Sequence, residues 1–384
     1  MHPRLALSVG NFFGAIYYSL VLTIFAPYLA LFLPDTRIGL VIAAAALATL
    51  GLFPFMPRLV RAFGSRRIVV TLALSQAVLL SVLALSPAAA FAVLLLALVL
   101  ATAPLVAYHM DLLLEAATVE EGATGRVRTL YITGASIAYV LGPLLIGLLL
   151  DGTEAYWRVF LAAAFSLTPF IALFVVERLP EGEPPALHAI LDTCHCLWRD
   201  RDLRAAVLGA GVLQLFFNLA PFYIPLYLHS VLGFAWSDLG WMFAVMLLPF
   251  VFVEYPAGYV ADRWLGDKEL LVAGFAISGT AFAAIAFVTS ATPLLLIAAL
   301  LFLSRVGAAL IEAMTESHFF RRVSMHDVTT ISIFRMMRPL GSLVAPLLAS
   351  VLLITGNYAF FFVVSGALIV ALGIIVTIPL RDIR

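Results

Sequence analysis

The chain has few charged residues and is dominated by apolar ones. Charged types make up 11% of the 384 residues, apolar types make up 64%, and the mean hydropathy is +1.10. A soluble domain is typically about half apolar and about a quarter charged. This composition therefore excludes an ordinary water-soluble protein.

Lysine and cysteine are also scarce. Lys268 is the one lysine beside 21 arginines, and the net charge is zero, so nothing indicates a nucleic-acid partner. Cys194 and Cys196 are one residue apart, which gives no disulfide framework. With His195 between them, the three side chains are too crowded in sequence for a tetrahedral metal site. We expect neither a metal nor a cofactor.

The chain does contain long apolar runs. A helix needs roughly 20 mostly apolar residues to cross a bilayer, and only helices or closed barrels satisfy their backbone groups in lipid. The runs are too continuous for barrel strands, so we expect an all-α integral membrane protein. Twelve transmembrane helices are predicted, at about 5–33, 37–56, 67–86, 89–113, 129–150, 156–177, 204–230, 237–257, 269–290, 293–316, 330–354 and 357–379.

The basic residues predict the orientation of these spans. With the N-terminus inside, Arg37 and Arg158 are the only basic residues in outer loops, and Arg305 lies within a span. Cytoplasmic loops carry an excess of basic residues, so we expect both termini in the cytoplasm of a bacterial cell, at its plasma or inner membrane. The first apolar run is too long for a signal peptide.

A polar segment with several prolines, 178–203, separates six spans from six. We expect an N-terminal six-helix bundle at 1–177, a cytoplasmic inter-domain loop at 178–203, and a C-terminal six-helix bundle at 204–384. The two bundles match as pseudo-repeats at shifts of 201 to 203 residues. The matched pairs include Gly39 with Gly240, Asp111 with Glu312, and Pro143 with Pro346.

The polar connection after the second span of each bundle is the clearest repeat. Residues 254–269 read EYPAGYVADRWLGDKE, and residues 52–67 read LFPFMPRLVRAFGSRR. A shift of 202 places Arg61 on Arg263, Gly64 on Gly266, Arg66 on Lys268, and Val60 on Asp262. The first copy therefore lacks the acid of the second.

The twelve spans, the repeat and this connection resemble the major facilitator superfamily. The stretch from Gly258 to Lys268 is similar to that family's inner-loop signature, G-x-x-x-D-R-x-x-G-x-K. The resemblance implies two rocking halves with a substrate site between them near the membrane midplane, and an inner connection that locks the inner side. The gating residues it implies are Gly258, Asp262, Arg263, Gly266 and Lys268, with Arg61 and Gly64 in the first copy. The alternative is a solvated basic loop.

The two glycines of the second copy have separate physical roles. Gly258 is expected to let two helices approach closely, and Gly266 to permit a tight turn. Both expectations concern backbone geometry and can be checked directly.

Charges within the spans are candidates for function, because an intramembrane charge is costly. Glu254 can carry a coupling proton, or pair structurally with an arginine of a neighbouring helix. Arg305 lies near the middle of its span; it can bind an anionic group of a substrate, or pair with Glu312 or Glu254. Asp111 is the first-half counterpart of Glu312.

Acidic span ends precede basic span starts in both halves. Asp111 and Glu115 close span four before Arg126 and Arg128, and Glu312 and Glu316 close span ten before Arg335 and Arg338. We predict ion pairs that form an inner gate; the alternative is ordinary interface charge of little energetic weight.

Polar and aromatic residues on several spans are candidates for the substrate cavity. They either face substrate or bond and pack between helices: Asn11, Tyr18, Gln214, Asn218 and Trp241. Gly142 and Pro143 in span five are similar to the Gly-Pro motif of the family's exporters, which favours export.

The sequence thus predicts a secondary active transporter, not an enzyme, that exports a small solute by alternating access in exchange for protons. We expect a monomer in the lipid bilayer. An importer or uniporter of the same fold, a non-transporting membrane sensor and a lipid-modifying membrane enzyme stay open as alternatives.

Overall fold

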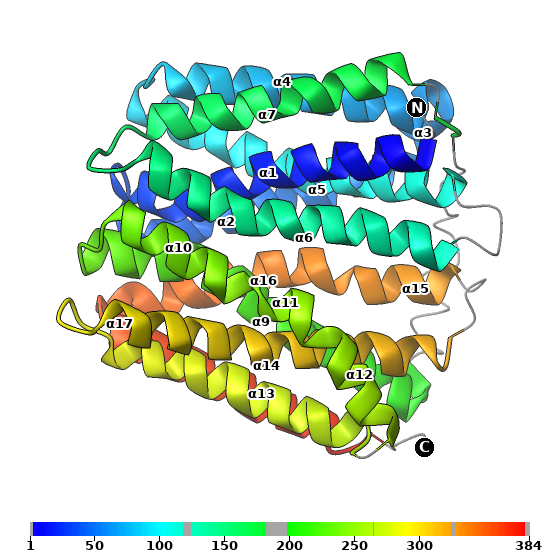
Figure 1. The fold of residues 1–384 in the computed structure, drawn as a ribbon, viewed down its shortest axis with the longest axis vertical. Coiled ribbons are helices and arrows are strands. Elements are labelled where there is room, and N and C mark those ends of the chain that lie inside the picture. The colour runs from blue at the N-terminus through cyan, green and yellow to red at the C-terminus, as the bar shows by residue number, and fades with distance from the viewer. Residues whose placement is uncertain are drawn as a thin grey trace. The chain divides into compact units, whose positions relative to one another are not determined.

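The computed structural model describes residues 3–117, 124–177, 179–181, 198–263, 265–323 and 328–380, and every regular element in these ranges is a helix (Figure 1). Only the backbone is described at 3, 4, 124–130, 254, 255, 262, 328, 329 and 332. The all-α prediction is confirmed.

The first half of the chain contains α1 (Pro3–Ala30), α2 (Asp35–Leu52), η1 (Phe53–Phe55), α3 (Met56–Phe63), α4 (Ser65–Ala84), α5 (Ala89–Ala117), α6 (Thr124–Leu149) and α7 (Tyr156–Val176). The second half contains α9 (Arg201–Pro225), η3 (Leu226–Val231), α10 (Trp236–Leu247), α11 (Pro249–Phe252), α12 (Glu254–Arg263), α13 (Asp267–Ala284), η4 (Ile285–Phe287), α14 (Leu294–Phe320), α15 (Val328–Arg335), α16 (Met337–Leu352), η5 (Leu353–Thr355) and α17 (Tyr358–Thr377).

Eleven of the twelve predicted spans correspond to helices that are long and apolar enough to cross a membrane, within the described ranges. The eighth predicted span, 237–257, is instead broken into α10, α11 and α12. Pro249 and Pro256 cannot donate a backbone hydrogen bond to the preceding turn. Just before the first break, the Leu248 N–H donates to the Val245 carbonyl at 3.2 Å. This acceptor is three residues back in the chain, whereas an α-helix uses the carbonyl four residues back. Proline spacing therefore explains the departure from one continuous helix.

The helices form two compact units. Unit 1 comprises Met1–Leu33, Ala44–Pro185 and Phe234–Ala244, and unit 2 comprises Pro34–Ala43, Ala186–Gly233 and Val245–Arg384. The start of α2 thus packs within unit 2, and most of α10 packs within unit 1. Apart from these two exchanged segments, the units follow the two six-span parts of the sequence.

Each of the two exchanged segments contains a glycine that lies close to a backbone carbonyl of the same unit. In unit 2, a Cβ added at Gly39 would overlap the carbonyl oxygen of Pro346. In unit 1, a Cβ added at Gly240 would lie 2.7 Å from the carbonyl oxygen of Pro143. The two glycines match each other in the sequence repeat, and so do the two prolines. The repeat therefore appears as a pair of equivalent glycine–carbonyl contacts, one in each unit.

In unit 2, α13 packs against α14 and α17 (Figure 1), and α9 packs against α14 and α16. A buried apolar cluster lies where α9, α14 and α15 meet, and the rings of Phe319 and Phe334 stack in it at 4.2 Å between centroids. This cluster fixes the end of α14, which carries most of the polar residues described below.

Candidate inner connections and intramembrane charges

A glycine starts the helix that follows each polar connection. Gly64 precedes α4 with φ 80°, and Gly266 precedes α13 with φ 100°. Residues with a Cβ rarely adopt such positive φ values. The tight turn expected at Gly266 is present, and the matching position of the first copy has the same kind of turn.

The basic residue two positions after each glycine makes the same contact in both units. Arg66 donates from its guanidinium to the carbonyl of Glu177, just after α7, at 2.8 Å. Lys268 donates from Nζ to the carbonyl of Ile378, just after α17, at 2.9 Å. The last carbonyls of a helix have no partner within it and attract cations. Each connection is thus tied to the end of a long helix of its own unit.

The negative charge at the helix start differs between the two copies. In unit 1, the Glu181 carboxylate accepts from the backbone N–H groups of Ser65 at 2.6 Å and Arg66 at 3.3 Å. These N–H groups belong to the first turn of α4, which has no partners of its own for them. Glu181 follows α7 in the sequence, so a residue outside the helix supplies the cap.

In unit 2, the corresponding charge is Asp267, the first residue of α13 itself. Its side chain is 2% exposed; Oδ2 lies 3.1 Å from His318 Nδ1, and Oδ1 lies 3.5 Å from the Arg321 guanidinium. Both partners lie at the end of α14. The helix dipole favours the Arg321 cation there, as it favours the Asp267 carboxylate at the start of α13.

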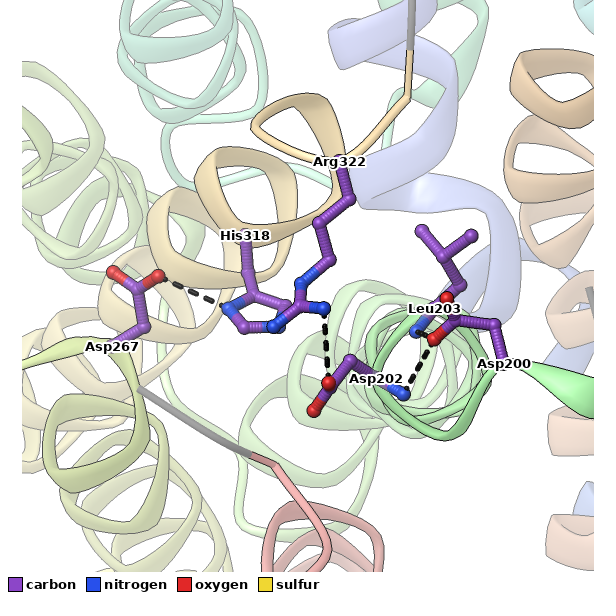
Figure 2. A network of polar contacts seen from close by, with 6 residues as sticks. All are labelled: Asp200, Asp202, Leu203, Asp267, His318 and Arg322. Carbon is purple, nitrogen blue, oxygen red and sulfur yellow. Dashed lines mark hydrogen bonds and ion pairs between the residues drawn. The ribbon is translucent and has the colours of Figure 1, made fainter. Parts of the chain in front are cut away.

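Arg322, also after α14, joins a third helix end to this network. Its guanidinium lies 2.9 Å from Asp202 Oδ2 at the start of α9. Asp200 caps α9, because its Oδ1 accepts from the N–H groups of Asp202 and Leu203 at 2.9 and 3.0 Å. Figure 2 shows His318 and Arg322 pointing from the end of α14 to the two separate aspartates. The network therefore holds the ends of α9, α13 and α14 together.

The predicted ion pairs between an acidic span end and a basic span start are present in unit 2. Arg335 of α15 lies 2.8 Å from Glu316 of α14, and Arg338 of α16 lies 4.0 Å from Glu312. The first-half counterparts, Asp111 and Glu115, are exposed at the end of α5. The side chains of Arg126 and Arg128 lie outside the described residues, so that pairing stays a prediction.

A small cavity lies beside these pairs. Its volume is about 20 Å³, and it is lined by Gln214, Glu312, Glu316, Arg335 and Arg338, among others. A volume of roughly this size holds one water molecule. The cavity thus places a polar, water-sized space next to the carboxylates of α14.

Arg305 of α14 does not pair with Glu312, which corrects one of the sequence-based alternatives. The Arg305 side chain lies with its guanidinium carbon 4.7 Å from the centre of the Phe216 ring, and the residue is 3% exposed. Glu312 is instead the partner of Arg338. The Glu254 side chain lies outside the described residues, so its proton-carrying or structural role stays a prediction.

Among the described residues, the close helix approach predicted at Gly258 is not found. A Cβ added there would meet no described atom within 4 Å, so packing of the described residues does not require glycine. Arg263 is exposed and lies over the ring of Tyr259 at 4.5 Å. Arg61 is exposed at the matching place, and Val60 is buried. The side chain of Asp262 lies outside the described residues.

The comparisons with known proteins agree with this architecture. The sequence profile of the Major Facilitator Superfamily matches residues 7–239 and 206–383. The chain belongs to the Major Facilitator Superfamily. Membership of this family indicates a multi-pass membrane transporter of small solutes.

Two solved structures of transporters share the fold of this major facilitator. The nucleoside transporter NupG is 13% identical with a TM-score of 0.77, aligned over 98% of both chains. A bacterial homologue of the human lysosomal transporter Spinster, in an inward-facing and occupied conformation, is 14% identical with a TM-score of 0.73, over 97% of this chain and 94% of the other. No curated protein sequence matches the chain. At these identities the structures establish the fold and not the substrate.

Most of the cavity candidates of this major facilitator bond or pack between helices. Asn11 donates to the carbonyl of Tyr131 on α6 at 3.0 Å. Asn218 accepts from Ser342 of α16 at 2.8 Å. The Tyr18 ring lies edge-to-face with Tyr139 at 6.4 Å. These contacts favour the interhelical alternative for all three.

The remaining candidates differ in what surrounds them. A Cβ added at Gly142 would overlap Ser19 of α1, and Ser19 donates to the carbonyl of Tyr139 at 3.2 Å. The glycine of the Gly142–Pro143 motif therefore permits close packing of α6 on α1. Gln214 lines the small cavity, and Trp241 is half-buried on α10.

The network around Asp267 was not predicted as a site. The sequence contained a signal for it: an acid directly after a turn glycine, and histidine and arginine at the end of span ten. Helix ends attract opposite charges, but which ends meet is decided by packing of helices far apart in the sequence.

Proposed function

We propose that this major facilitator is a secondary active transporter that exports a small organic solute by alternating access in exchange for protons. The observation that supports the proposal most directly is the pair of carboxylate–arginine contacts between the end of α14 and the starts of α15 and α16. They lie beside a cavity that can hold a water molecule.

Protonation can control these contacts. A proton on Glu316 removes the charge that holds Arg335 at 2.8 Å, and the same holds for Glu312 and Arg338. Both pairs are partly exposed, so each contributes about 1 kcal/mol or less. Such weak contacts can open and close in each transport cycle. Glu254 is a second candidate for carrying the proton.

Export as the direction of transport rests on Gly142 and Pro143, which are similar to the motif of the family's exporters. We place the protein, as a monomer with both termini cytoplasmic, in the plasma or inner membrane of a bacterial cell. Import or uniport would use the same fold, and the experiment below separates them.

The test is proton movement in proteoliposomes with an imposed pH gradient and an internal fluorescent pH reporter. Drugs and metabolites are added to the wild type, to Glu316→Gln and to Glu254→Gln. Glu269→Gln is the control, because Glu269 is an exposed carboxylate near the start of α13. We expect solute-dependent proton flux in the wild type and the control, and its loss in Glu316→Gln, in Glu254→Gln, or in both.

Other outcomes contradict parts of the proposal. Solute movement without proton movement would replace coupling with uniport, and proton flux in the opposite sense would indicate import. Binding without flux would favour a sensor, and chemical change of added lipids would favour a lipid-modifying enzyme. Flux that is unchanged in both variants would remove the two glutamates from the proton path.

A further inference from the structure

Arg305 is a deeply placed cation in the described part of the molecule. It is the twelfth residue of α14, which begins at Leu294. At a rise of 1.5 Å per residue it lies about 17 Å along the helix, near the middle of a hydrocarbon core about 30 Å thick. The residue is 3% exposed.

Among the described side chains, no carboxylate neutralises Arg305. Glu312 and Glu316 on its own helix contact Arg338 and Arg335. On the neighbouring helices α9 and α13, the buried acids are Asp202 and Asp267, which contact Arg322 and His318 near the far end of α14. The Nε of Arg305 is buried without a hydrogen-bond acceptor.

The contact that Arg305 does make is with the face of the Phe216 ring, at 4.7 Å. A cation over an aromatic ring is stabilised by the ring electrons. The cost of burying an ion is larger than this gain, so the ring offsets only part of that cost. The guanidinium has a planar fork of N–H donors, whose geometry matches the oxygens of a carboxylate, a phosphate or a phosphonate.

The ring that contacts the guanidinium is the first of three linked aromatic rings. The centroids of the Phe216 and Phe217 rings are 6.1 Å apart, and those of the Phe217 ring and the Phe250 ring of α11 are 5.8 Å apart. Phe217 and Phe250 are each only half-buried. A ligand at Arg305 would therefore meet a cation at one end and apolar ring surface beside it.

We propose that Arg305 binds the anionic group of the transported solute, and that this solute is a small organic anion with an apolar body. The inference rests on the proposed transport function and specifies its substrate class. The bound carboxylate or phosph(on)ate supplies the counter-charge of Arg305, and Phe217 and Phe250 contact the apolar part.

The first experiment measures thermal unfolding of the solute-free protein in lipid nanodiscs. Arg305→Met removes the cation and keeps an unbranched apolar side chain. Because an unneutralised buried charge destabilises the fold, we expect the unfolding midpoint to rise. Arg158→Met is the control, since Arg158 also lies over a ring, Trp157, but is exposed. Arg158 donates to the carbonyl of Leu149 at 3.3 Å, so the midpoint of this control should stay the same or fall slightly and should not rise.

A midpoint of Arg305→Met that stays the same or falls would overturn the inference. It would mean that a protein carboxylate, such as that of Glu254, already neutralises Arg305. The double variant Arg305→Met with Glu254→Gln would then restore the lost stability, and this would identify the partner.

The second experiment measures binding by calorimetry in nanodiscs. The probes are benzoate, phenylacetate and phenylphosphonate, with the neutral benzamide and phenylacetamide as matched amides. We expect at least one anion to bind the wild type more tightly than its amide does. Arg305→Gln should weaken that binding at least about tenfold, which corresponds to about 1.4 kcal/mol. Arg305→Lys should recover part of it, and Arg158→Gln should leave it unchanged.

The comparison of the carboxylates with phenylphosphonate shows which head group the site prefers. Absence of any anion preference, or equal affinity in Arg305→Gln, would overturn the inference. Transport is measured separately. Arg305-dependent binding without flux would leave the site in place and reject the proposed function. Proton-coupled flux of neutral solutes without anion binding would reject the site and keep the function.

Discussion

The two inner connections have the same backbone plan and different electrostatics. Each begins a helix after a glycine with positive φ, at Gly64 and at Gly266. Each sends a basic side chain, Arg66 or Lys268, to a carbonyl just after a long helix of its own unit, α7 or α17. They differ in the carboxylate at the helix start.

The carboxylate in unit 1 comes from Glu181, which is exposed and outside the helix, whereas Asp267 in unit 2 is in the helix and buried against α14. The exposed acid satisfies backbone N–H groups of one helix. The buried acid instead holds the end of a second helix through His318 and Arg321. A duplicated fold can therefore keep the position of a charge while changing what that charge connects.

The largest effect should come from Asp267→Ala. Removing one member of a buried, charged contact leaves the others without a counter-charge and typically costs 3–5 kcal/mol. We expect a loss of about 3 kcal/mol in the free energy of unfolding, measured by SDS titration in mixed micelles. His318→Ala in the same background should then cost much less than it does alone, because the two side chains act as one unit. Losses of Asp267→Ala and His318→Ala that simply add in the double variant would show that the two side chains do not act as one unit.

A smaller effect is expected for Glu181→Ala. Loss of a helix cap costs roughly 1 kcal/mol, and the acid is exposed, so no buried charge is left behind. Glu181→Gln should retain part of the stability, since the amide oxygen still accepts from the N–H groups of Ser65 and Arg66. The same titration measures both variants. A loss as large as that of Asp267→Ala would mean that the two connections do not differ as described.

The smallest effects should come from the contact that both units share. Arg66→Gln and Lys268→Gln each remove one hydrogen bond to a carbonyl at a helix end, for about 0.5–1.5 kcal/mol. The two losses should agree within about 0.5 kcal/mol and add in the double variant, because the two bonds have separate acceptors, the carbonyls of Glu177 and Ile378. Clearly unequal losses would show that the two hydrogen bonds contribute differently to the free energy of unfolding, although their geometry matches.

Much of the fold was predictable because its signals are local. Apolar length predicted twelve spans, and eleven of them are long helices in the described residues. A constant shift matched Arg66 with Lys268, and the structure shows that these two residues make the same contact. The eighth span was predicted as one helix from its apolar composition. That composition takes no account of the backbone N–H groups that Pro249 and Pro256 lack. The ion pairs of Glu312 and Glu316 followed from opposite charges at consecutive span ends.

The sites that depend on non-consecutive helices were not predictable in the same way. Gly258 has the residue type for close packing, yet no described neighbour approaches it. The sequence placed Asp267 in the polar connection between two spans, whereas in the structure its side chain is buried against α14. Asn11 and Asn218 had two possible roles, and each makes a hydrogen bond to a neighbouring helix, which favours the interhelical one.

The sequence by itself determined the membrane-spanning helices, the duplication and the family, because apolar runs and repeated turn residues act over short stretches of chain. Only the tertiary structure decided which charges meet. It brought His318 to Asp267 and Arg322 to Asp202, and it placed Arg305 beside Phe216 instead of a described carboxylate. Charge interactions depend on separation in space and on burial, and helix packing sets both.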